Sequence, residues 1–237
     1  MNPVVMPSTG VTAYANLEQK PGWTKQSGPA ITGPGAVTPS IWDILQVTPP
    51  PVQPPTTLTL QTTGVKGQWA DWMAKAPTIA IPKDWTGNFL LRASYTFDSV
   101  VGIQAFEVGR RLTNAQQITD NGQMQMVPGS GGLMQVDIVP SAAGGWKDTG
   151  IRFPTFVANQ LYQEEIYYQS TPAGVLSIQY VMLNGNLQPI PASCQNIAGS
   201  KQNPAWGASE AVPAYQCDAN PTAIPFNPVV ALSCYAW

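Results

Sequence analysis

The chain of 237 residues contains no histidine, and this absence decides most of the catalytic question. Histidine is the usual general base near neutral pH, and it completes the common serine and cysteine triads and most transition-metal sites. The remaining acids include one adjacent pair, Glu164-Glu165, which falls in a predicted strand and so faces opposite sides of a sheet. A glycosidase needs two carboxyl groups about 5–10 Å apart across one groove. Glu107 or Asp137 could supply a partner, but no pattern in the sequence pairs them.

We therefore interpret these acids as solvated strand residues and predict no catalytic residue. No stretch places acidic residues at the alternating spacing of a calcium loop, and Asp120-Asn121-Gly122 is explained as a turn. The Gly-rich stretch 127–132 lacks the Lys-Ser/Thr of a phosphate loop and is interpreted as a hairpin connection. The three cysteines, Cys194, Cys217 and Cys234, are an odd number at wide spacing, which is not a disulfide framework, and without histidine they do not make a zinc site. Buried free thiols are expected, one bridge stays open, and no metal or cofactor is predicted.

Three of the eight tryptophans, Trp69, Trp72 and Trp85, cluster before the main predicted strand. Exposed aromatic rings in such a cluster would form a stacking platform for sugars. Trp69 and Trp72 also suit one helical turn packed on a sheet, where they would serve as core or interface anchors. Both interpretations remain open.

Charged residues make up 10% of the chain, against about 25% in typical soluble domains. A surface with few charges is typical of a subunit covered by partners, although secreted β proteins share the feature. The net charge is −2, with Arg110-Arg111 as the only adjacent basic pair, so direct nucleic-acid binding is not expected. Neither a signal peptide nor a run of about 18 apolar residues is found, which predicts synthesis in a host cytoplasm and no membrane span.

Residues 1–57 are expected to form an extended arm, because eleven of the 24 prolines lie within 1–55. The stretch 38–46 suits a short helix with Thr38 as its cap. Apolar residues along the arm suit anchors on other subunits of an assembly: Tyr14, Trp23, Ile41, Trp42 and Leu45.

The segment 58–191 alternates apolar and polar residues in short runs separated by Gly, Pro and Asn turns. This pattern predicts an all-β fold, an antiparallel sandwich of the jelly-roll kind, with its clearest strand at 89–97. Residues 192–237 are predicted to be rich in loops, with a closing strand at 229–235.

The hairpin 161–188, which ends in Leu183-Asn184-Gly185-Asn186-Leu187, resembles a recurring hairpin of concanavalin-like and laminin-G-like sandwiches. In composition and layout the chain also resembles decoration and minor virion proteins of tailed bacteriophages. These resemblances imply a non-enzymatic structural component of a virion that forms oligomers with other capsid subunits through its arm. The alternatives are a lectin-like carbohydrate-binding module and a polysaccharide-degrading enzyme of concanavalin-like fold.

Overall fold

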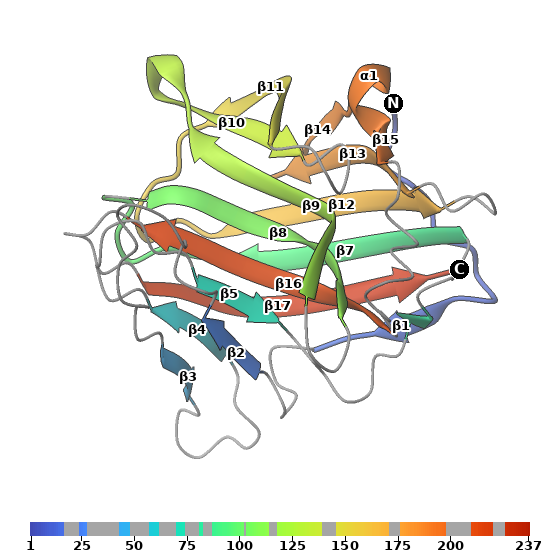
Figure 1. Cartoon of the computed structure of the whole chain (residues 1–237), viewed down its shortest axis with the longest axis horizontal. Coiled ribbons are helices and arrows are strands. Elements are labelled where there is room, and N and C mark those ends of the chain that lie inside the picture. The colour runs from blue at the N-terminus through green and yellow to red at the C-terminus, as the bar shows by residue number, and fades with distance from the viewer. Residues whose placement is uncertain are drawn as a thin grey trace.

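The strands of the chain form two antiparallel sheets (Figure 1). The computed structural model describes residues 1–16, 24–27, 43–47, 57–61, 70–73, 81–82, 87–101, 103–113, 118–138, 146–170, 176–197, 210–219 and 226–237. Within these ranges, no helix is long and apolar enough to cross a membrane.

Sheet A has its central strands in the order β14-β13-β12-β7-β17-β4-β3. Strand β1 also pairs with β17, and β15 pairs with β13. The bounds are β1 Thr12–Tyr14, β3 Asp43–Val47, β4 Thr57–Gln61, β7 Gly87–Tyr95, β12 Tyr162–Ser170, β13 Leu176–Leu183, β14 Asn186–Pro189, β15 Asn196–Ile197 and β17 Phe226–Ala236.

Sheet B has the order β11-β10-β9-β8-β16-β5-β2, with β6 pairing with β16. The bounds are β2 Thr24–Ser27, β5 Ala70–Met73, β6 Ile81–Pro82, β8 Ile103–Thr113, β9 Ile118–Pro128, β10 Leu133–Ile138, β11 Lys147–Pro154 and β16 Glu210–Ala219. A 3-10 turn, η2 at Ser130–Gly132, joins β9 to β10, and the short helix α1, Ala192–Gln195, follows β14.

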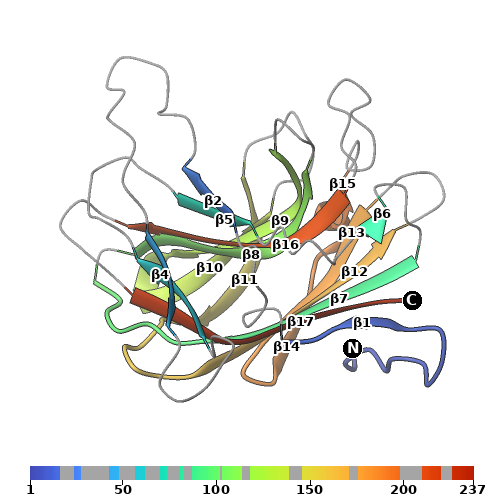
Figure 2. The same ribbon diagram turned by 90° about the horizontal axis from the view of Figure 1, so that it is seen from below.

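The two sheets pack face to face as two layers (Figure 2), which confirms the predicted antiparallel sandwich. Alternate residues of β7 enter the core between them, from Phe89 to Tyr95, as the period-two pattern predicted. Aromatic rings dominate one part of this core, where Tyr95 lies 4.4 Å from Phe106 between ring centroids and Phe97 lies 4.8 Å from Phe156. Such contacts fix the spacing of the sheets and so the position of side chains on their outer faces.

The corner between β13 and β14 is a two-residue turn at Asn184-Gly185, as the sequence predicted. Both residues have positive φ, 49° and 80°, which the two-residue turns of twisted hairpins require and which Asn and Gly adopt most readily. The Asn184 side-chain oxygen accepts a hydrogen bond of 2.8 Å from the Gln163 backbone N–H of the neighbouring strand. The turn thereby holds β12, β13 and β14 in register.

Strand β16 is the main element that the sequence interpretation missed within 192–237. Pro213 interrupts its pattern, and proline is rare inside sheets because it lacks a backbone N–H. On one side β16 pairs with β8 along its whole length. On the other side it pairs with β6 at Glu210–Ala211 and with β5 at Ala214–Gln216, so Pro213 falls between two partners.

Three local predictions were wrong. Residues 43–47 form β3 rather than the end of a helix over 38–46, because the cross-strand partner β4 supplies a full ladder of pairs that a short isolated helix lacks. Residues 38–42 lie outside the described ranges. Asp120-Asn121-Gly122 lies inside β9, where Asp120 pairs with Arg111 of β8 next to a shift in register, and Trp72 lies in β5 rather than in a helical turn.

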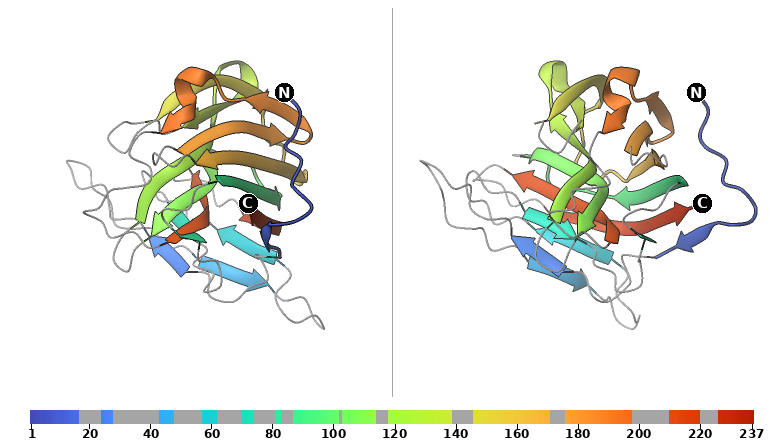
Figure 3. Two further views of the ribbon diagram at one scale, coloured as in Figure 1. Left: turned by 90° about the vertical axis from the view of Figure 1, so that its right-hand side faces the viewer. Right: turned by 45° about the vertical axis from the view of Figure 1, so that its right-hand side comes forward.

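The first residues of the arm lie on their own chain. Figure 3 shows the N-terminal segment running along the outside of sheet A towards β1, near the C-terminus. Val4 and Met6 pack on a cluster at the outer face of sheet A that contains Leu90, Tyr167 and Tyr180. The Val4 backbone N–H donates a hydrogen bond of 3.1 Å to the Tyr180 hydroxyl. This part of the arm therefore docks in cis.

Candidate functional site

The outer face of sheet B carries polar side chains where the inner face carries apolar ones. In β9, Met124 and Met126 enter the core and Gln125 lies between them. In β10, Val136 and Ile138 enter the core and Asp137 lies between them. Because successive side chains of a strand point to opposite faces, Gln125 and Asp137 lie on the face turned away from sheet A. In β11, Arg152 follows the same rule between the core residues 151 and 153.

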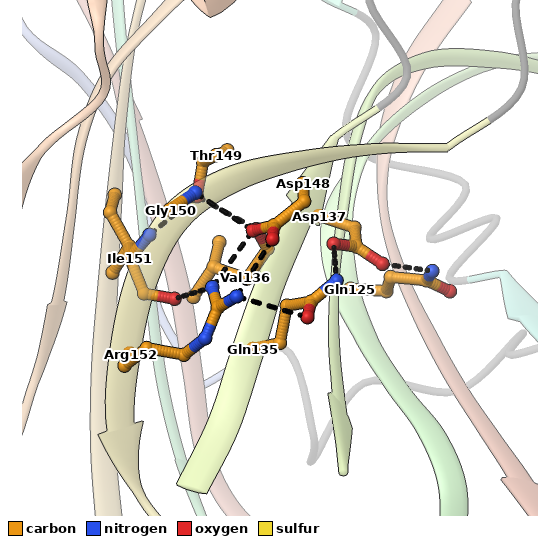
Figure 4. A network of polar contacts seen from close by, with 9 residues as sticks. All are labelled: Gln125, Gln135, Val136, Asp137, Asp148, Thr149, Gly150, Ile151 and Arg152. Atoms are coloured by element: carbon orange, nitrogen blue, oxygen red, sulfur yellow. Dashed lines mark hydrogen bonds and ion pairs between the residues drawn. The ribbon is translucent and has the colours of Figure 1, made fainter. Parts of the chain in front are cut away.

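These side chains form one continuous hydrogen-bonded row across three strands (Figure 4). Arg152 donates from Nη2 to Gln135 Oε1 at 3.1 Å, and Gln135 donates from Nε2 to Asp137 Oδ1 at 2.7 Å. Gln125 donates from Nε2 to the other Asp137 oxygen at 3.1 Å. At the far end, the Arg152 guanidinium binds both Asp148 oxygens, at 2.7 and 2.8 Å. We call Gln125, Gln135, Asp137, Asp148 and Arg152 the polar row.

A bulge in β11 brings the two ends of its ion pair together. Gln135 pairs with Arg152, but Asp137, two residues on, pairs with Asp148, four residues away. Gly150 absorbs the irregularity with a φ of 80°, and the Asp148 carboxylate accepts a hydrogen bond of 2.8 Å from its backbone N–H. The hydrogen bond from Arg152, supported by that N–H, lowers the pKa of the Asp148 carboxyl to about 2. Asp148 is therefore ionised at any ordinary pH.

Backbone register extends the polar row towards the middle of sheet B. Gln125 in β9 is the cross-strand partner of Glu107 in β8, and Glu107 is the partner of Gln216 in β16. Gln216 in turn is the partner of Asp71 in β5. A line of carboxyl and amide residues thus crosses five strands at one level of the sheet, from Asp137 to Asp71.

Asp137 and Gln125 are enclosed although they lie on the outer face, with exposed fractions of 6% and 7%. Arg152 and Asp148 are more open, with side-chain exposures of 30% and 42%. Carboxylates and amides in an enclosed setting can accept and donate hydrogen bonds to hydroxyl groups with little competition from water. A carboxylate placed in this way can also accept a proton from a bound water.

A second polar cluster lies on the outer face of sheet A. Glu165 is buried there, and it receives a hydrogen bond from Arg92 Nε at 2.6 Å and another from the Tyr180 hydroxyl at 2.5 Å. The Arg92 guanidinium also lies 5.5 Å from the centre of the Tyr235 ring. The N-terminal segment packs on this cluster through Val4, so it is part of how the arm is held.

Glu164 faces the opposite way, into the core between the sheets. Its carboxyl is buried and accepts a hydrogen bond of 2.8 Å from the Tyr95 hydroxyl, while its Oε1 has no hydrogen-bond partner. Burial raises the pKa of this carboxyl to about 8, and the bond from Tyr95 opposes the rise only in part. The sequence prediction that Glu164 and Glu165 face opposite sides is confirmed, but the prediction that they are solvated was wrong.

The remaining predicted residues are spread over the molecule. Tyr14 lies in β1 opposite Cys234, and Leu45 lies in β3 opposite Thr59. Trp72 lies in β5, opposite Tyr215. The other predicted arm and platform residues lie outside the described ranges: Trp23, Ile41, Trp42, Trp69 and Trp85. Docking of the arm on another subunit and a tryptophan sugar platform stay predictions.

The sequence interpretation weighed Asp137 but missed the rest of the polar row. One signal was available: Gln123-Met124-Gln125-Met126 alternates amides with methionines, which marks a strand with one polar face. The cysteine prediction fared better, since Cys194 and Cys234 are buried free thiols. Burial raises the pKa of the Cys234 thiol to about 12, so it remains protonated.

Comparison with known proteins finds similar structures but no similar sequence. No protein-family model and no curated protein matches the chain. Alginate lyase A1-II′ of polysaccharide lyase family 7, in its Y284F form with product GGG, is similar with a TM-score of 0.50 and 14% identity, covering 93% of this chain and 98% of its own. An alginate lyase from Alteromonas sp. 272 has a TM-score of 0.42 and 10% identity, covering 82% and 94%. The carbohydrate esterase vb_24B_21 from bacteriophage phi24B has a TM-score of 0.45 and 8% identity, covering 96% and 90%.

These comparisons correct the functional prediction made from the sequence. The expectation of a non-enzymatic structural component of a virion is contradicted, because the similar structure with a TM-score of 0.50 is an alginate lyase. At such low identity the likeness shows the fold alone. The chain adopts a concanavalin-like jelly roll, the fold of polysaccharide lyase family 7.

Proposed function

We propose that the chain is a polysaccharide-degrading enzyme whose substrate lies along the outer face of sheet B. The observation that carries this proposal is the polar row, with the enclosed Asp137 carboxylate held by two amide groups. Sugar hydroxyl groups are matched by carboxylate and amide groups, and a row across several strands has the length to contact several sugar units. The shared fold with a polysaccharide lyase is consistent with this use of the face.

Glycoside hydrolysis suits the acids that the register brings together. Asp137 and Glu107 lie at one level of sheet B with a single strand between them. Strands are about 4.8 Å apart, so their backbones are separated by roughly 9.6 Å. Inverting glycosidases place their two carboxyl groups about 6.5–9.5 Å apart, a distance of the same order as this backbone separation, which leaves room for the attacking water.

The hydrogen bonds of Asp137 support one role, and Glu107 takes the complementary one. Both Asp137 oxygens accept amide N–H groups, so Asp137 is placed to accept a proton and is assigned as the base that activates water. Glu107 is assigned as the acid. As the water oxygen bonds to the anomeric carbon, the glycosidic C–O bond breaks, Glu107 gives a proton to the leaving oxygen, and Asp137 takes the proton from the water. The product is released with inverted anomeric configuration.

The test is depolymerisation of a polysaccharide panel by the full chain, measured as new reducing ends. The panel contains neutral polymers (laminarin, lichenan, xylan, glucomannan) and uronic-acid polymers (alginate, polygalacturonate). Asp137→Asn and Glu107→Gln are each expected to lower the rate on the cleaved polymer by about a hundredfold or more, the usual contribution of a general acid or base. Gln163→Ala, an exposed residue of sheet A, is the matched control and should leave the rate unchanged.

Two results would contradict the proposal. If the chain neither binds nor cleaves any polymer of the panel, the proposed function is wrong. If both carboxyl variants keep full activity, the chain is an enzyme but Asp137 and Glu107 do not have the assigned roles. Proton NMR of the first product distinguishes inversion from retention and checks the spacing of the two acids independently.

A further inference from the structure

The polar row contains one cation, and the chain itself already neutralises it. Arg152 donates hydrogen bonds from Nη1 and Nη2 to the two Asp148 oxygens. Nη1 also donates to the Ile151 carbonyl, and Nη2 also donates to Gln135 Oε1. A guanidinium bound in this bidentate way keeps no free pair of N–H groups for an external carboxylate. The other described cation of β11, Lys147, donates instead to the Ser193 carbonyl of α1.

The charges that remain on the row are negative. Asp137 and Asp148 are two carboxylates against the single Arg152 guanidinium, and the low pKa of Asp148 keeps its charge in place. Among the side chains that the structure describes on this face, an anionic polymer would meet this negative balance and one guanidinium that is already paired. A polymer with hydroxyl groups alone would meet amides and carboxylates that accept and donate hydrogen bonds without charge repulsion.

We infer that this site takes an uncharged polysaccharide and that the Asp148–Arg152 ion pair is the device that excludes uronic-acid polymers. The inference rests on the proposed function and narrows it to a substrate class. It also separates the chain from the alginate lyase with which it shares its fold. The discrimination against uronic acids arises because the Arg152 guanidinium is already ion-paired. Removing the charge of its partner should therefore allow uronic-acid polymers to bind.

Asp148→Asn is the direct test. The asparagine keeps an oxygen to accept the Gly150 N–H, so the bulge is retained, while its loss of charge frees the Arg152 guanidinium. In affinity electrophoresis the wild-type chain should be retarded by neutral polymers and not by alginate or polygalacturonate. Asp148→Asn should gain retardation by the uronic-acid polymers, with affinity raised roughly tenfold, the size of one charge-assisted hydrogen bond.

Two further variants serve as controls. Asp148→Glu keeps the negative charge beside Arg152 and should therefore gain no retardation by the uronic-acid polymers. Asp148→Asn combined with Arg152→Gln should lose the gain, because the freed cation is gone. The gain should also disappear in about 0.5 M sodium chloride, where the Debye length falls to about 4 Å, while binding of neutral polymers should persist. Circular dichroism of each variant checks that it is folded.

The outcomes separate this inference from the function on which it rests. Wild-type binding or cleavage of alginate or polygalacturonate at least as good as that of neutral polymers overturns the inference and leaves the enzyme proposal intact. A folded Asp148→Asn variant with no gain also overturns it. Failure to bind or cleave any polymer, neutral or acidic, instead overturns the proposed function.

Discussion

Glu164 and Glu165 are adjacent in β12 and show how strongly surroundings decide the behaviour of one residue type. Glu165 is buried against a guanidinium and a tyrosine hydroxyl on the outer face of sheet A. Glu164 is buried in the core with a single hydrogen bond from Tyr95. Glu165 is a carboxylate in an ion pair, whereas Glu164 is a carboxyl group whose neutral form is favoured by burial.

Stability should therefore fall as pH rises, through Glu164. Its pKa is 4.5 when unperturbed and about 8 in the folded chain. Below the lower value both states carry the proton and stability is full. Between the two values only the unfolded chain ionises, so the free energy of unfolding should fall by about 1.4 kcal/mol per pH unit. Above the higher value both states are ionised and the loss is complete.

Glu164→Gln removes this contribution, because the amide does not ionise. The measurement is the free energy of urea unfolding from pH 5 to pH 9, compared between the variant and wild type. The difference between the two curves isolates Glu164 from all other titrating groups. Parallel curves would show that Glu164 is ionised in the folded chain and would contradict its placement in the core. Glu164→Leu repeats the comparison should the amide disturb packing.

The period-two pattern predicted which way Glu164 and Glu165 face but could not predict their burial. Alternation along one strand separates its two sides, and it carries no information about what covers each side. The outer face at Glu165 is covered by residues as distant as Val4, and the polar row assembles from three strands. Residue-scale geometry of this kind depends on contacts between strands, which one sequence without relatives does not contain.

At the scale of elements, the N-terminal segment is a short extended piece with two sides. Val4 and Met6 pack on the sheet A cluster, whereas Met1 and Val5 are 72% and 88% exposed. Successive side chains point to opposite sides, as in a β-strand, although the segment lacks a full ladder of backbone hydrogen bonds. The segment is held by side-chain burial and by the Val4 bond to Tyr180.

Replacing both inward residues should destabilise the chain, and replacing both outward ones should not. Val4→Ala with Met6→Ala removes apolar area from a half-buried site, for which we expect a loss of about 1–3 kcal/mol. Met1→Ala with Val5→Ala is the matched control, with a change within about 0.5 kcal/mol. Urea unfolding of the two double variants measures the difference. Equal stabilities would mean that the segment leaves the sheet in solution.

Elements with a clean alternation were predictable, and those with conflicting local signals were not. β7, β12 and β13 followed their apolar periods. β16 was missed because a proline such as Pro213 is unusual in a central strand. Pro213 is tolerated because it falls between the residues that pair with β6 and those that pair with β5, so no ladder hydrogen bond is needed from it on that side. β3 was mistaken for a helix because Thr38 and Pro39 suit a helix start, a local preference that pairing with β4 overrides.

At the scale of the whole molecule, the C-terminal strand joins parts of the chain that are far apart in sequence. β17 lies between β7 and β4 in sheet A and also pairs with β1. Cys234 and Ala236 belong to the core between the sheets. Trp237 exchanges two backbone hydrogen bonds with Asn88, of 2.8 and 3.1 Å, and its ring stacks on Tyr167. The sequence predicted a closing strand at 229–235 but not its partners, since the residues of one strand do not specify which strands meet.

Removal of residues 226–237 should abolish cooperative folding. It would leave one edge of β7 without a partner, detach β3 and β4 from sheet A, and remove the strand on which β1 docks. Sequentially distant pairings of this kind form only when the whole sheet forms, so the loss is not confined to one edge.

Removal of Trp237 alone is the control: every strand pair survives, and we expect a folded chain whose free energy of unfolding is lowered by about 1–3 kcal/mol through the lost ring stack and hydrogen bonds. Near-ultraviolet circular dichroism, size-exclusion chromatography and urea unfolding distinguish the two. A chain that ends at residue 225 yet unfolds cooperatively near the wild-type midpoint would show that sheet A closes without β17, contrary to the strand order on which the whole fold depends.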